Sequence, residues 1–99
     1  MAIEFIVKES AKNEIIEIVD WYNYKQSGLG ERFYQDLMIK FEKIKRNPSI
    51  YSFYRKDFRR AVIKNFPYLV IFKVAENEIV VYTIIYGGRD PELINKRIS

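Results

Sequence analysis

The middle of the chain concentrates basic side chains that attract anions. Between positions 43 and 64 there are eight lysines and arginines against one aspartate, a net +7, in a chain whose formal net charge is +4. The arginine fork binds phosphate through two hydrogen bonds, and such a stretch attracts phosphates, nucleic acid or an acidic partner. The alternative is that these side chains only solubilise a helix end and a loop, since charged residues are usually exposed. The basic residues of this stretch are Lys43, Lys45, Arg46, Arg55, Lys56, Arg59, Arg60 and Lys64.

Two missing residue types exclude several kinds of chemistry. The 99 residues include no cysteine and no histidine. This excludes disulfides, a thiol nucleophile, metal sites built from Cys or His, and a Ser-His-Asp triad.

The length and the apolar runs bound the class of protein. A chain of 99 residues predicts one domain, over residues 1–99. Its longest apolar run, residues 79–86, is far shorter than the ~20 residues that span a bilayer. The first residues carry Glu4 where a signal peptide has basic residues. We expect a cytoplasmic protein without a membrane segment.

Two helices are predicted in the first half, after a short strand over residues 3–7. Ala11, Ile15, Ile18 and Tyr22 repeat at helical spacing, so we expect one apolar stripe that ends with Trp21 and Tyr22 in the core. This helix should end near Ser27, with Gly28 in a left-handed conformation. The second helix should end at Asn47-Pro48, because proline cannot continue the ladder. Its apolar stripe consists of Phe33, Leu37, Phe41 and Ile44.

In the second half of the chain the apolar residues follow the patterns typical of β-strands. Residues 59–64, 69–75 and 79–86 read as three strands, and the last is apolar on both faces and therefore central. Pro91 suits the first turn of a final helix through Arg97. The predicted order is β-α-α-β-β-β, an α+β fold in which a helical hairpin packs on one face of an antiparallel sheet.

Strand alternation then sorts the basic residues. If Ala61 and Ile63 face the helices, Arg60 and Lys64 face the open side of the sheet. Arg59 has the other parity, but it lies at the strand entrance, where a bend could turn it outward. We predict a shallow basic groove that suits RNA, or an acidic peptide, because arginine binds phosphate and aromatic rings stack on bases. The groove comprises Arg55, Lys56, Arg59, Arg60, Lys64 and Arg89, edged by Tyr54, Tyr68 and Tyr86.

The chain as a whole resembles the RelE/ParE toxin superfamily. The resemblance rests on the element order, on Arg60-Ala-Val-Ile-Lys-Asn-Phe-Pro-Tyr68 with the strand that follows it, and on Tyr86-Gly-Gly-Arg89-Asp-Pro91. Each motif alone is weak, whereas their order and spacing together are specific. The resemblance implies the toxin half of a bacterial type II toxin–antitoxin pair.

This superfamily contains two activities. RelE-like members cut messenger RNA in the ribosome without a metal, and the resemblance makes Arg60 and Arg89 candidates for stabilising the phosphorane. The proton carriers would come from Tyr86, Glu92, Lys56 or Lys64, none of which has the family's spacing. ParE-like members bind DNA gyrase and cut nothing. The Phe-Pro-Tyr and Arg-Asp-Pro patterns favour the ParE-like branch, and a nontoxic remnant that only binds antitoxin is the third alternative.

All three alternatives imply a protein partner. We expect a cognate antitoxin with a segment that is disordered alone and lays a helix or a strand across the toxin. The exposed part of the helical hairpin and the open side of the sheet are its expected docking places. The target is DNA gyrase, or the translating ribosome with its mRNA, and neither a metal nor a small-molecule cofactor is implied.

Overall fold

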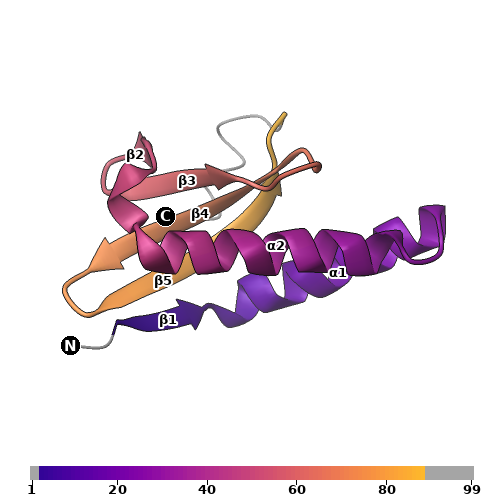
Figure 1. Ribbon diagram of the computed structural model, residues 1–99, viewed down its shortest axis with the longest axis horizontal. Helices are drawn as coiled ribbons and strands as arrows, with labels where there is room; N and C mark the ends of the chain where they lie inside the picture. Colours follow the sequence, from indigo (N-terminus) through magenta and orange to yellow (C-terminus); the bar gives the residue numbers. More distant parts are fainter. Residues whose placement is uncertain (1–2, 89–99) are drawn as a thin grey trace.

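The structure, a computed structural model, describes residues 3–88 (Figure 1). The final helix expected through Arg97, together with Arg89 and Glu92, lies outside the described residues. In chain order the described elements are β1 (Glu4–Val7), α1 (Glu9–Lys25), α2 (Leu29–Arg46), a 3-10 turn η1 (Pro48–Ile50), β2 (Phe53–Arg55), β3 (Phe58–Val62), β4 (Tyr68–Ala75) and β5 (Glu78–Tyr86).

The strands form one sheet in the order β1-β5-β4-β3-β2. The helical hairpin packs on one face, so the α+β class is confirmed, and β5 lies inside the sheet as its two apolar faces predicted. The expectation of a wholly antiparallel sheet is wrong in one place. β1 pairs with β5 in parallel and forms one edge of the sheet. The helical hairpin that follows β1 carries the chain across the sheet to the opposite edge, where β2 and β3 lie. β2 was not predicted, since a strand of 3 residues carries no readable period.

The core lies between the helices and one face of the sheet. The whole predicted stripe of α2 is buried, and Phe33, Leu37 and Ile44 are fully inaccessible. From the strands, Val70 and Phe72 of β4 meet this stripe. Burial of such side chains contributes about 1.5–3 kcal/mol each, which makes this interface the main source of stability.

The opposite face of the sheet carries a second, smaller apolar cluster. Ile71 and Ile85 are buried at its centre, and Leu69 and Tyr82 pack against them. Ile71 pairs with Arg60 of β3, so alternation puts this cluster and the Arg60 side chain on the same face.

The two helices cross closely at the start of α2. Gly28, before α2, has φ 87, which confirms the predicted left-handed residue. Gly30 is buried, and its N–H donates a 2.8 Å hydrogen bond to Oδ1 of Asn23 on α1. A Cβ at Gly30 would lie 2.3 Å from the carbonyl oxygen of Val19. This contact requires a residue without a side chain.

A carboxylate fastens α1 to an irregularity in the sheet. The register between β4 and β5 shifts at Ile71/Phe72. Beside this shift, Oε1 of Glu14 accepts hydrogen bonds from the Thr83 hydroxyl (2.8 Å) and from the Ile84 N–H (3.0 Å). Thr83 is 1% exposed, so water cannot replace the carboxylate as its acceptor.

Substituting Glu14 is therefore expected to destabilise the fold. Glu14→Ala leaves the Thr83 hydroxyl and the Ile84 N–H unsatisfied, and we expect the free energy of unfolding to fall by about 2–3 kcal/mol. Glu14→Gln keeps an oxygen acceptor and should cost less than half as much. Urea denaturation of the two variants measures the difference, and equal losses would show that these hydrogen bonds are not the cause.

Candidate functional site

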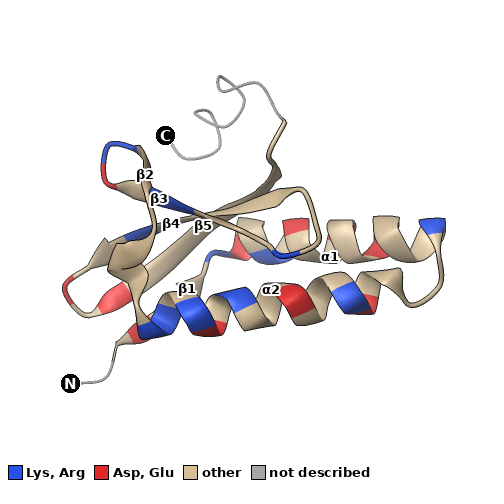
Figure 2. Cartoon of the chain, turned by 45° about the horizontal axis from the view of Figure 1, so that its top comes forward, with Lys and Arg blue, Asp and Glu red and all other residues tan. Residues whose placement is uncertain are grey.

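The basic stretch of the sequence folds onto one part of the molecule. Figure 2 shows Lys and Arg at the turn between β2 and β3, on β3, and along the second half of α2. Arg55 and Lys56 are exposed at that turn, where Lys56 has φ 51. The turn's one acid, Asp57, lies 3.4 Å from Lys73 of β4. Both arginine and lysine at the turn therefore point their charge at solvent.

Alternation along β3 divides its side chains as the sequence predicted. Ala61 is buried against the helices, and Arg60 and Val62 are exposed. The pattern continues just beyond the end of β3, with Ile63 buried and Lys64 exposed in the turn. Arg60 is anchored through its backbone, since its N–H donates to the Ser52 carbonyl at 3.0 Å. No side chain between positions 3 and 88 pairs with its exposed guanidinium, which can therefore meet an anion at the surface.

Arg59 does not join this exposed set. Its side chain lies on the helix-facing side, where Nη1 donates to the carbonyls of Tyr51 (2.7 Å) and Ser49 (3.4 Å). The guanidinium also stacks over the Phe53 ring at 4.0 Å. Arg59 thus holds the segment after α2 against β3, and its fork is occupied by the protein itself.

A polar recess lies at the edge of the sheet beside Arg60. β2 pairs only with Phe58 and Arg59, so it stops before the second half of β3. The recess there has a volume of ~540 Å³. It is lined by Lys40, Ile50, Tyr51, Ser52, Arg60, Ala61, Val62 and Leu69.

Lys40 is the lining residue that the sequence analysis missed. Its ammonium lies 5.6 Å from the centre of the Tyr51 ring. Burial, and secondarily the charge of Lys43, lowers the pKa of Lys40. Burial also raises the pKa of the Tyr51 hydroxyl. Helical spacing could have indicated its partial burial, because Lys40 directly precedes the buried Phe41 and lies three residues after the buried Leu37.

Two of the candidate catalytic residues, Arg60 and Tyr86, do not lie together. Tyr86 pairs with Tyr68 near one end of β4, whereas Arg60 pairs with Ile71, so β4 separates Tyr86 from Arg60. The Tyr86 ring packs edge-on against Tyr68 at 5.9 Å. The Tyr68 and Tyr86 hydroxyls contribute, after burial, to raising the pKa of Tyr22. Within residues 3–88, no three acidic side chains are arranged as metal ligands.

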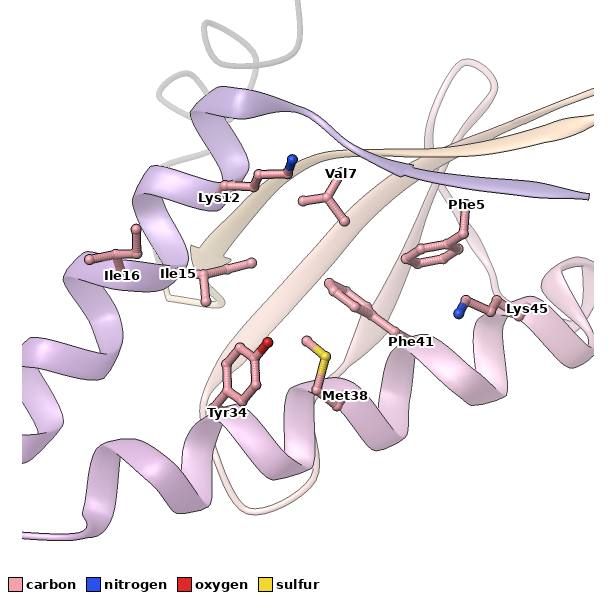
Figure 3. Close-up of a pocket in the computed structure, with 9 residues that line it drawn as sticks. All are labelled: Phe5, Val7, Lys12, Ile15, Ile16, Tyr34, Met38, Phe41 and Lys45. Atoms are coloured by element: carbon pink, nitrogen blue, oxygen red, sulfur yellow. The ribbon is translucent and has the colours of Figure 1, made fainter.

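An apolar groove opens at the opposite edge of the sheet. Figure 3 shows side chains from β1, α1 and α2 that converge on it. Its volume is ~420 Å³. The walls are Phe5, Val7, Ile15, Ile16, Tyr34, Met38 and Phe41, with Lys12 and Lys45 among them.

Both lysines of this groove have weak local partners. Lys12 lies 3.9 Å from Glu9, and Lys45 lies 2.9 Å from Glu42, which are exposed pairs within one helix. Such pairs contribute about 0–1 kcal/mol and are easily exchanged for others. The groove therefore combines an apolar floor with exchangeable positive charge.

The prediction that Trp21 belongs to the core is wrong. Trp21 is 51% exposed, with Lys25 over its ring at 4.5 Å, whereas Tyr22 packs into the core as predicted. The helical hairpin projects beyond the sheet, so nothing among the strands covers this part of α1 (Figure 1).

Comparisons with known proteins agree with this architecture. A family model described as the ParE toxin of the type II toxin–antitoxin system parDE matches residues 5–91. A solved structure of a chromosomal ParDE toxin–antitoxin system from P. aeruginosa superposes with a TM-score of 0.76 at 15% identity. That alignment covers 85% of this chain and 95% of the other chain, and it shows a shared fold. No curated protein sequence matches the chain.

Fold and family match together define a toxin of a type II toxin–antitoxin system. The match spans most of the chain and distinguishes the two branches of the superfamily. The chain belongs to the ParE toxin family. In the described part of the chain, neither helix is sufficiently long and apolar to cross a bilayer.

Proposed function

We propose that this toxin inhibits growth by binding DNA gyrase in the cytoplasm, without cutting RNA. The family match supports this, since ParE-like members of the superfamily are the gyrase-directed ones. The observation that carries the proposal is the separation of Arg60 from Tyr86 by β4, which argues against a site in which Arg60 stabilises the phosphorane and Tyr86 transfers the proton. General acid–base catalysis needs such groups within hydrogen-bond reach of the reacting atoms.

A paired assay tests this proposal. Purified toxin is added to gyrase with relaxed plasmid and ATP, and in parallel to a translating extract whose mRNA ends are mapped. Loss of supercoiling with intact messages is the expected result. Codon-phased cuts with unaffected supercoiling would establish the ribosome-dependent endoribonuclease instead. No effect in either assay, with unimpaired growth on induction, would identify a nontoxic antitoxin-binding remnant.

The antitoxin of this pair is proposed to dock in the apolar groove. The lining offers aromatic and aliphatic side chains, including Phe5, Met38 and Phe41, to the apolar face of a partner segment. Lys12 and Lys45 then favour acidic residues on the flanks of that segment. A segment that is disordered alone and folds on the toxin would bind in this way.

Met38→Glu is expected to release the toxin from its antitoxin. The substitution puts a carboxylate on the apolar floor, where it also competes with the acidic residues of the antitoxin for Lys12 and Lys45, and this should weaken the complex by about 100-fold. Ile39→Glu is the matched control, because Ile39 is 53% exposed on the same helix and does not line the groove. Titration calorimetry with the antitoxin encoded beside the toxin gene measures both affinities. If Ile39→Glu weakens the complex as much as Met38→Glu, the docking place is wrong.

A further inference from the structure

We propose that the recess between Lys40 and Arg60 binds the phosphate backbone of a nucleic acid. The recess lies at the sheet edge where β2 has ended, and three segments distant in sequence meet around it. Lys40 comes from α2, Ser52 from the segment before β2, and Arg60 from β3. At ~540 Å³ it has ample room for a phosphate group and a sugar.

The polar groups of the recess can donate hydrogen bonds to an anion. The guanidinium, the ammonium and the Ser52 hydroxyl are all donors, and phosphate oxygens are acceptors. Among residues 3–88, no carboxylate lines the recess. Among the residues that the structure describes, the ion pairs involve Lys12, Lys45 and Lys73, so Lys40 and Arg60 have no carboxylate partner there.

The environment of Lys40 favours an anionic ligand. Its ammonium is partly shielded from water and lies near a second positive charge on Lys43, and both effects lower its pKa. A bound phosphate would reverse them, because an opposite charge within a few ångströms stabilises the ammonium form. Partial burial without a described carboxylate partner thus makes the Lys40 ammonium a favourable contact for an anion that enters the recess.

A phosphate chain fits the surroundings better than a single carboxylate does. The positive charge continues from the recess to Arg55 and Lys56 at one end and to Lys64 at the other, all of them exposed. Arg60 on β3 and Lys64 in the turn after it are both exposed, so the positive charge extends beyond the recess, as contact with more than one phosphate of a chain requires. Ile50 and Val62, 68% and 59% exposed, provide apolar walls that suit sugar rings.

Fluorescence anisotropy with the full-length protein tests the proposal. The probes are a labelled 20-base-pair DNA duplex and a single-stranded RNA of the same length, each titrated between 50 and 200 mM salt. Lys40→Gln and Arg60→Gln should each weaken binding by about tenfold at low salt and reduce the slope of log K against log salt by about one. Lys25→Gln removes the same charge at the tip of the hairpin and should change binding less than twofold. Thermal denaturation of each variant confirms that it is folded.

The outcomes separate the alternatives. Tighter binding of either probe, lost in the two recess variants and kept in Lys25→Gln, supports a phosphate site and identifies DNA or RNA as the ligand. Equal loss in all three variants would show attraction by net charge alone and overturn the proposal. It would also be overturned if polyglutamate competed as well as DNA at equal salt, or if neither probe bound at 50 mM salt. A Lys40→Gln protein that loses DNA binding and still inhibits gyrase would support both the phosphate site and the proposed function, so the two proposals can be tested independently.

Discussion

Replacing Gly30 with alanine is expected to destabilise this protein by about 3 kcal/mol, although alanine is the better helix former. Helix propensity alone would make the substitution favourable by about 1 kcal/mol. The added methyl, however, meets the Val19 carbonyl oxygen at 2.3 Å and the Asn23 side-chain amide at 2.7 Å. The backbone oxygen cannot move without shifting α1, so the two helices must separate and lose the Gly30–Asn23 hydrogen bond. A fall in the free energy of unfolding would therefore show that Gly30 is needed for close packing of the helices, whereas a rise would show that helix propensity decides.

Gly28→Ala is the matched control for this prediction. Gly28 has φ +87, and a Cβ there would meet no atom of the described residues within 4 Å, so alanine brings only backbone strain. That strain costs about 1–2 kcal/mol. Chemical denaturation of both variants gives the comparison. A Gly30→Ala protein more stable than the parent would mean that the helices do not cross as closely as described.

Phe33→Ala is expected to cost about 4 kcal/mol, a large share of the total stability of about 5–15 kcal/mol. Phe33 is fully buried at the centre of an aromatic cluster. Its ring centroid lies 5.3 Å from that of Phe66, 5.6 Å from that of Tyr68 and 5.7 Å from that of Tyr22. These partners belong to α1, the β3–β4 connection and β4, so the ring joins both helices to the sheet.

Calorimetry measures this effect as a fall in the unfolding temperature of roughly 15–30 °C. Phe33→Leu retains most of the buried volume and should lose less than half as much. A ligand that binds only the folded state raises the unfolding temperature, so we expect added antitoxin to recover part of the loss. A Phe33→Ala protein that melts within a few degrees of the parent would place the main support of the hairpin elsewhere.

The sequence predicts the regular elements of this fold well. The stripe from Phe33 to Ile44 and the two long strands have strong periods, and both are found within a residue or two of their predicted limits. The pairing of β1 with β5 could not be predicted, because strand register between opposite ends of the chain has no local signature. The exposure of Trp21 also depends on distant parts of the chain. An apolar residue at the end of a helical stripe is buried only if another element covers it.

The residues of the candidate site could be predicted only where the alternation of a single strand decides which side chains are exposed. Alternation alone puts Arg60 and Lys64 on the exposed side of the predicted strand over residues 59–64. In the structure both are exposed, Arg60 on β3 and Lys64 in the turn that follows, because β3 ends at Val62. Lys40 and Arg59 depend on the path of residues 47–52, which no pattern specifies. That segment turns the Arg59 fork toward its own carbonyls and brings α2 beside the end of β3.

The parallel pairing of the first strand with the last has a consequence for biosynthesis. Val7 finds its neighbour, Val81, only after the 73 residues between them have been made. A nascent chain whose residues 78–86 are still inside the ribosomal exit tunnel can form the helices, but its sheet has no β5 to which β1 can add. The five-stranded sheet, and any toxicity that depends on it, therefore arises only after β5 has left the ribosome.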